Sequence, residues 1–191
     1  MRRRTFDTLV SGAGLLIAVV LLAAGGLLTW GYSFVNGQVH DQLASQQIFF
    51  PAANSKAVQG PEFAAMRVYG GQQLTTGAQA ETYANHFIAV HLTEVAGGKT
   101  YAQVSTLAQA DPTNTVLQAQ VATLFKGNTL RGMLLNAFAF WKMGQLALIG
   151  AVGSFGAAAL MLILSLFGLR HARRVAPEVE LGAKTPARVE V

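Results

Sequence analysis

Two long apolar segments dominate the hydrophobic pattern of the chain. Residues 9–30 carry no charged side chain over 22 positions, and residues 143–169 carry none over 27. A helix rises about 1.5 Å per residue, so about 20 apolar residues cross a hydrocarbon core about 30 Å thick. Both segments are therefore predicted to be transmembrane helices, and the second has spare length for tilt.

The residues between the two spans follow a helical pattern. Apolar side chains continue every fourth position beyond the first span, which predicts that this helix extends outward as a stalk. These side chains are Val35, Val39 and Leu43. A loop over 51–61 and a short helix over 62–69 are predicted next. No strand-like alternation extends beyond about four residues, so 31–142 is predicted to be an all-α bundle.

Two capping boxes predict where helices of this bundle begin. Thr76 with Gln79, and Thr100 with Gln103, have the spacing at which a hydroxyl and an amide satisfy each other's free backbone donors. Gly97-Gly98 is predicted to end the first of these two helices with a left-handed cap.

Three more boundaries are predicted closer to the second span. Asp111-Pro112 indicates a helix start, with Asp as N-cap and Pro as first helical residue. Lys126-Gly127 is predicted to end that helix, and Asn128 or Thr129 to cap the last one. An apolar stripe in the last helix leads into the second span, which predicts one continuous helix of about 40 residues. The stripe comprises Leu130, Met133, Leu134, Ala137, Phe138 and Trp141.

The net charge of +5 is concentrated at the two ends of the chain. Residues 1–8 form a basic N-terminus, and Arg170, Arg173 and Arg174 follow the second span. Residues 31–142 are nearly neutral, with six Lys or Arg against five Asp or Glu. The positive-inside rule therefore predicts a plasma-membrane protein with both termini cytoplasmic and 31–142 extracytoplasmic. Without a basic stripe in 31–142, no nucleic-acid partner is predicted.

Aromatic residues support this orientation. Trp30 and Tyr32 close the first span and Trp141 opens the second, as expected at the outer headgroup level. The first apolar run exceeds the 7–15 residues typical of a signal peptide, and Leu22-Ala23-Ala24 provides no A-x-A cleavage site. We therefore expect an uncleaved anchor. The chain has no cysteine, so disulfides and thiolate metal sites are excluded.

Candidate metal ligands are few and poorly spaced. His91 and Glu94, three residues apart, could share a helix face, and His40 could reach them from the stalk. His86 lies about 140° around the helix from His91, so these two cannot chelate one ion. The alternative is that His91 hydrogen-bonds within the bundle, and this interpretation is preferred. No catalytic, cofactor or metal site is predicted, because carboxylates occur singly and no nucleophile motif is present.

Small residues in the spans predict close helix packing. They let helices approach in lipid, where no hydrophobic force drives association. The two spans could pack on each other or on a partner's helix, although small residues are also common in spans generally. The residues are Gly14 and Ala18 in the first span, and Gly150, Gly153, Ser154, Ala157 and Ala158 in the second. Neither span has a central ionisable residue, which disfavours a transporter or channel core.

Residues 29–34, 83–92 and 136–143 carry a resemblance to a known family. In these stretches the sequence is similar to a family of small two-span actinobacterial membrane proteins of uncharacterised role. Members are often labelled aromatic ring-opening dioxygenases. Such chemistry is expected to use an iron site of two histidines and a carboxylate on cytoplasmic substrates, whereas the candidate ligands here are predicted to lie outside. The resemblance implies an actinobacterial plasma-membrane protein.

These observations predict a structural or interaction role. The chain would display its helical domain outside the membrane as a homo-oligomer or as an accessory subunit of a larger complex. A ligand-sensing module is the alternative; residues 170–191, predicted to be a cytoplasmic tail disordered from Ala176, are too short for an output domain, so a partner would carry the signal. A metal-dependent enzyme is the third possibility.

Overall fold

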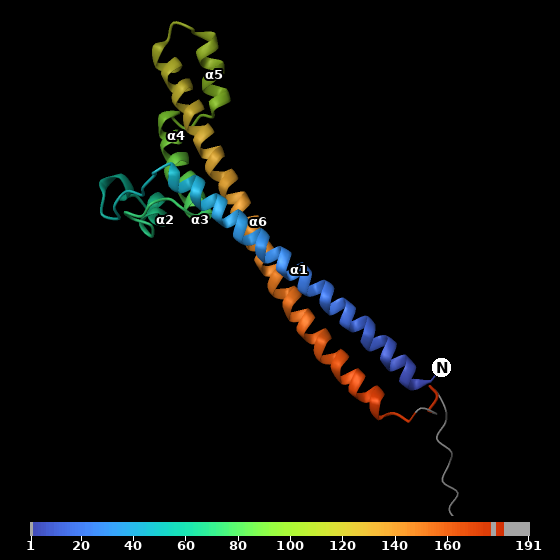
Figure 1. Ribbon diagram of the computed structural model, residues 1–191. Coiled ribbons are helices and arrows are strands. Elements are labelled where there is room, and N and C mark those ends of the chain that lie inside the picture. Colours follow the sequence, from blue (N-terminus) through green and yellow to red (C-terminus); the bar gives the residue numbers. More distant parts are fainter. Residues whose placement is uncertain (1, 177–178, 182–191) are drawn as a thin grey trace, which may run out of the picture. The chain divides into compact units, whose positions relative to one another are not determined.

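The computed structural model describes residues 2–176 and 179–181 (Figure 1). Every regular element in this part of the chain is a helix, which confirms the predicted all-α class. In chain order the elements are α1 (Arg3–Ser45), η1 (Lys56–Val58), η2 (Pro61–Phe63), α2 (Ala64–Arg67), α3 (Gly77–Tyr83), η3 (Ala84–Ile88), α4 (Ala89–Val95), α5 (Tyr101–Ala110) and α6 (Thr115–Arg174).

Backbone contacts divide the chain into two compact units. Unit 1 comprises Met1–Gly31 with Ala147–Val191, and unit 2 comprises Tyr32–Leu146. Both long helices contribute to both units, because α1 extends to Ser45 and α6 begins at Thr115. The predicted stalk is therefore confirmed as helix, and so is the continuity of the last helix with the second apolar segment. That helix has 60 residues, so its predicted length of about 40 is wrong.

In unit 1, α1 and α6 pack along a seam with a seven-residue repeat. The buried positions are Ser11, Ala18 and Gly25 on α1, and Ala151, Ala158, Ser165 and Ala172 on α6. Half-buried positions lie three or four residues from each of them. A strict seven-residue repeat is the pattern of helices that supercoil around each other. Here the buried residues are small, which lets the two backbones approach closely.

The two helices of this seam exchange serine and glycine contacts. A Cβ added at Gly14 would collide with the Ser165 hydroxyl, and one added at Gly168 would collide with the Ser11 hydroxyl. Residue 11 therefore faces 168 while 14 faces 165, which requires α1 and α6 to run antiparallel (Figure 1). The hydroxyls occupy space that only the facing glycines leave open.

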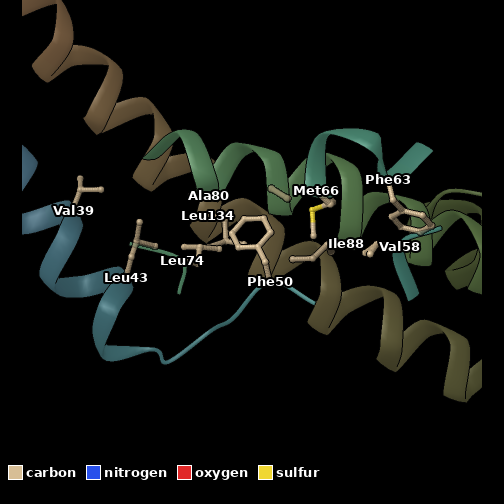
Figure 2. Packing of buried hydrophobic residues seen from close by; sticks show 11 residues of the cluster. Val39, Leu43, Phe50, Val58, Phe63, Met66, Leu74, Ala80, Ile88 and Leu134 are labelled. Atoms are coloured by element: carbon tan, nitrogen blue, oxygen red, sulfur yellow. The ribbon is translucent and has the colours of Figure 1, made fainter. Parts of the chain in front are cut away.

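Unit 2 has a main hydrophobic core built from its loop and short helices (Figure 2). Phe50, Met66 and Leu74 lie at its centre with almost no exposed surface. Val39 and Leu43 of α1 and Leu134 of α6 close it from the long helices. Burying a side chain of this size stabilises the fold by about 1.5–3 kcal/mol.

A β-bridge that the sequence pattern did not predict closes the loop region of unit 2. Phe49 and Gln73 form an isolated antiparallel bridge. The Phe50 N–H donates to the Gln72 carbonyl at 2.9 Å, and the Leu74 N–H donates to the Ile48 carbonyl at 2.8 Å. This pairing directs Phe50 and Leu74 into the main core.

Both predicted capping boxes are present. The Thr76 hydroxyl accepts the Gln79 N–H while the Gln79 side chain accepts the Thr76 N–H, and Thr100 with Gln103 repeats the arrangement. Gln79 is buried, and its Oε1 also accepts the Thr75 N–H at 2.8 Å. The α3 start is therefore held by an amide whose burial is offset by several hydrogen bonds.

The predicted end at Gly97-Gly98 is also confirmed. Gly97 has φ +57° and Gly98 has φ +78°, a backbone region that favours glycine. The Gly98 N–H donates to the Thr93 carbonyl and the Gly97 N–H to the Glu94 carbonyl, which is the Schellman arrangement. The chain turns sharply here from α4 toward α5.

The predicted helix break at Lys126-Gly127 is wrong. α6 continues through both residues and through Asn128 and Thr129. A glycine inside a helix costs about 1 kcal/mol relative to alanine, but packing of a helix face outweighs propensity. A Cβ at Gly127 would collide with the side chain of Leu92 on α4, so this glycine permits a close approach.

The predicted helix start at Asp111-Pro112 is displaced by three residues. Asp111 caps the C-terminus of α5, and its carboxylate accepts a hydrogen bond from the Thr113 hydroxyl at 2.8 Å. The Asn114 side chain accepts the Leu117 N–H, so Asn114 performs the capping that was predicted for Asp111.

A second, smaller core joins α5 to the first turns of α6. Val104 and Leu124 are buried in it together with Ala96. Leu107 on α5 and Phe125 on α6 are exposed and take no part in this core. In the last predicted stripe Leu130 and Met133 are exposed as well, whereas Leu134 is buried.

α6 extends to Arg174, so the first residues of the predicted cytoplasmic tail, 170–174, are helical, and the location of this tail in the cytoplasm stays a prediction. Arg2 and Glu180 form an isolated bridge, and the Arg3 N–H donates to the Val179 carbonyl at 2.9 Å. The prediction of disorder is therefore wrong for 179–181. For 177–178 and 182–191 the prediction of disorder concerns residues outside the described part of the chain.

Candidate functional site

The histidine predicted as a metal ligand is engaged within unit 2. His91 Nδ1 donates a hydrogen bond to the Phe87 carbonyl at 2.7 Å. Its ring lies 4.4 Å from the Phe87 ring and 5.8 Å from the Phe63 ring, measured between centroids. These contacts agree with the preferred interpretation, in which His91 hydrogen-bonds within the bundle.

The other candidate ligands do not join His91. His40 Nδ1 lies 3.1 Å from the carboxylate of its neighbour Asp41, and both side chains are exposed. His86 Nδ1 donates to the Glu62 carbonyl at 3.2 Å. Among the described residues no three His, Asp or Glu side chains form a group that could hold a metal ion, so His40, His91 and Glu94 are not assembled into a site.

The small residues predicted for helix packing fall into two groups. Gly14, Ala18, Ser154 and Ala158 lie in the seam of unit 1, and a Cβ at Gly150 would lie 3.2 Å from Leu28. Gly153 and Ala157 instead lie on the exposed face of α6. They take no part in that seam, and their predicted packing against a partner helix stays a prediction.

The predicted interface aromatics also differ in surroundings. Trp30 is exposed, whereas Tyr32 is half-buried beside Gly144. Trp141 is half-buried against the main core of unit 2 and stacks on Phe138, with 6.1 Å between ring centroids. Its indole therefore contributes to the core of unit 2, and the placement of the three at a membrane surface stays a prediction.

A hollow of about 480 Å³ lies between α1 and α6 in unit 1. Its lining is apolar apart from Ser11, Ser165, Asp7 and His171. Asp7 Oδ2 is buried without a hydrogen bond, and His171 Nε2 lies 3.9 Å from it. This distance is too long for a hydrogen bond between the two side chains.

A second hollow, of about 320 Å³, lies in unit 2 between α4, the start of α5 and α6. Two cationic side chains, Lys99 and Arg131, line it together with Thr93, Thr100 and Asn128. Leu92 and Leu124 are among its apolar residues. The lining therefore combines cationic, hydroxyl and apolar groups.

A π-helical turn holds one of these cations. η3 interrupts the regular α-helix between α3 and α4, and Asn85 lies within it. Arg131 Nη2 donates to Asn85 Oδ1 at 2.8 Å, while Arg131 Nε is buried without a partner. π-Helical turns inside helices often occur at functional sites.

Sequence reasoning missed this second hollow. A signal was available, because Arg131 interrupts the otherwise apolar face of the last predicted helix. What could not be predicted was that Lys99 and Asn85, which are remote in sequence, lie on the elements packed around it.

The core beside these residues perturbs one tyrosine. Tyr83 packs edge-on against Phe50, with 5.4 Å between ring centroids, and against Phe87 at 4.8 Å. Burial raises the pKa of the Tyr83 phenol above its usual value of 10.0, because the phenolate would lose hydration. The phenol is therefore protonated at neutral pH.

Two helices are long and apolar enough to cross a membrane. The most apolar 18-residue windows of α1 and α6 have mean hydropathies of 2.3 and 2.2. Only 17% and 11% of these windows are buried within the structure, so the chain leaves most of this apolar surface uncovered.

Comparison with protein families found no matching family model, and no curated protein or solved structure matched significantly. The resemblance to actinobacterial membrane proteins therefore stays an expectation.

Proposed function

We propose that the chain is an integral membrane protein with a structural or interaction role, in which α1 and α6 cross the bilayer as an antiparallel hairpin and unit 2 is displayed outside the cell. The carrying observation is the large uncovered apolar surface on both long helices. In water this surface would be costly, whereas in a bilayer the hydrocarbon chains cover it. No catalytic reaction is assigned.

The charges support a direction for this hairpin. Arg2, Arg3 and Arg4 precede the apolar part of α1, and Arg173 and Arg174 end α6. The positive-inside rule favours both of these ends in the cytoplasm. Unit 2 then lies on the extracytoplasmic side. It contains no cysteine, so an oxidising environment there forms no disulfides in it.

The exposed face of α6 supports assembly with a second membrane helix. Gly153 and Ala157 are four residues apart and exposed, and nothing lies within 4 Å of a Cβ placed at Gly153. Pairs of small residues at this spacing form close helix contacts in bilayers. We propose that this face contacts another copy of the chain or another subunit of a larger membrane complex.

Native mass spectrometry of the full chain, purified in mild detergent, tests this assembly. We expect a multiple of the chain mass or a stoichiometric second subunit, and we expect Gly153→Leu to disrupt it. Val152→Leu, a change at the adjacent exposed position, is the matched control and should leave the assembly intact. A lone monomer, or an assembly indifferent to Gly153→Leu, contradicts the proposed contact.

Labelling of single cysteines tests the orientation, and the natural chain provides a cysteine-free background. A membrane-impermeant maleimide should label Gln109→Cys on α5 in intact cells. It should label Ala176→Cys, just beyond α6, only after the membrane is permeabilised. Both residues are exposed in the structure, so accessibility of the side chain itself does not limit either reaction. The reverse pattern would refute the proposed topology.

A further inference from the structure

We propose that the hollow in unit 2 binds a small organic anion, with its acid group held by Lys99 and Arg131 and its apolar body lying against Leu92 and Tyr101. The acid group is a carboxylate or a phosphate, since both match the fork of a guanidinium. Such a ligand is what an extracytoplasmic sensing role, the alternative to a purely structural one, would require.

The charge of the hollow selects an anion. Lys99 and Arg131 line it, and no Asp or Glu is among the ten residues that do so. In the described part of the chain neither cation has an acidic partner within 4.0 Å. The positive charge is therefore not neutralised by the protein itself, and an anion that enters would be attracted by both groups.

The guanidinium of Arg131 is oriented but incompletely satisfied. Its Nη2 donates to Asn85 Oδ1 at 2.8 Å, which fixes the plane of the group. Its Nε has no accessible surface, so a ligand in the hollow would contact Arg131 through its terminal Nη groups.

The remaining lining fits an organic body better than a bare inorganic ion. Leu92 and Tyr101 contribute apolar surface, and Thr93, Thr100 and Asn128 can hydrogen-bond. The volume of about 320 Å³ lies at the lower end of known small-molecule sites, which span about 300–1,000 Å³. A compact acid with a single ring or a short chain would fill it.

Benzoate and phenyl phosphate are suitable probes, with benzamide as the uncharged analogue of benzoate and inorganic phosphate as the anion without an apolar body. Binding to the full chain in mild detergent is measured by isothermal titration calorimetry. We expect saturable binding of at least one organic anion, and at least tenfold weaker binding of benzamide and inorganic phosphate. Detergent solution makes this result independent of the side of the membrane on which unit 2 lies.

Two substitutions and a matched control locate the site. Arg131→Gln and Lys99→Gln should each weaken binding at least tenfold, because each removes one positive charge from the lining. Lys126→Gln removes the same charge from an exposed position of α6 outside the hollow, and it should leave affinity unchanged. Lys99 is exposed, so its substitution leaves the core intact if Arg131→Gln destabilises unit 2.

The proposal would be overturned if neither organic anion bound. It would also be overturned if Lys99→Gln and Lys126→Gln weakened binding equally. Inorganic phosphate that binds as tightly as phenyl phosphate would overturn the assignment of an organic ligand. Loss of the assembly in Gly153→Leu bears on the membrane contact only, so the two proposals fail separately.

Discussion

Oxidation of the double variant Gly14→Cys/Ser165→Cys is expected to join α1 to α6 by a disulfide within one chain. A Cβ placed at Gly14 lies 3.6 Å from the Ser165 Cβ. Natural disulfides have Cβ separations of about 3.5–4.5 Å, so the bond should form without displacing either helix. The second pair, Ser11→Cys/Gly168→Cys, has the equivalent separation of 3.5 Å and should behave alike.

Reaction with a polyethylene glycol maleimide measures disulfide formation, because the reagent adds mass to each free thiol. A crosslinked chain has no free thiol, so it shows no mass shift on a denaturing gel. The control is Gly12→Cys/Ser165→Cys, since nothing lies within 4 Å of a Cβ at Gly12. That variant should remain reactive. A crosslinked dimer in place of the intrachain product would show that the serine and glycine contacts join two chains, and the described seam would be wrong.

Gly77→Ala is expected to destabilise unit 2 by about 1–3 kcal/mol, the usual cost of inserting a methyl group into a filled core. Gly77 is buried in the first turn of α3, and its Cβ would collide with the Cβ and Cγ atoms of Trp141 on α6. The position of the Trp141 Cβ is fixed by the backbone, so rotation of the side chain cannot relieve this collision. Relief requires α3 and α6 to move apart.

Gly132→Ala is the matched control, and it should change stability in the opposite direction. Gly132 is exposed inside α6, and nothing lies within 4 Å of its Cβ. Alanine there should stabilise the helix by about 0.8–1 kcal/mol. Urea unfolding can be followed by Trp141 fluorescence in a Trp30→Phe background, because the chain has two tryptophans. Equal effects of the two substitutions would contradict the packing of Gly77 against Trp141.

The proposed membrane contact and the anion site occupy different units and use different chemistry. Gly153 and Ala157 belong to unit 1 and provide a smooth apolar face. Lys99 and Arg131 belong to unit 2 and provide charge. Arg131 and Gly153 nevertheless lie on the same helix, α6. A ligand bound at Arg131 would therefore contact the same helix that carries the proposed membrane contact at Gly153.

The glycines show how far local sequence can lead. Gly97-Gly98 and Gly127 look equivalent as helix stops, yet only the first pair ends a helix. The Schellman arrangement at Gly97-Gly98 needs partners at most five residues away, Thr93 and Glu94, so the local pattern contains it. The role of Gly127 depends on Leu92, 35 positions earlier, which no local pattern reports.

By itself the sequence determined the two long apolar helices, the all-helical class, both capping boxes and the left-handed stop after α4, because each depends on composition or on residues a few positions apart. Only the tertiary structure decided that α6 runs unbroken from Thr115, that small residues of the two long helices interlock every seven positions, and that Arg131 bonds to Asn85 and lines one hollow together with Lys99. Those outcomes depend on side chains from distant segments filling one shared volume, and local periodicity contains no information about which segments will meet.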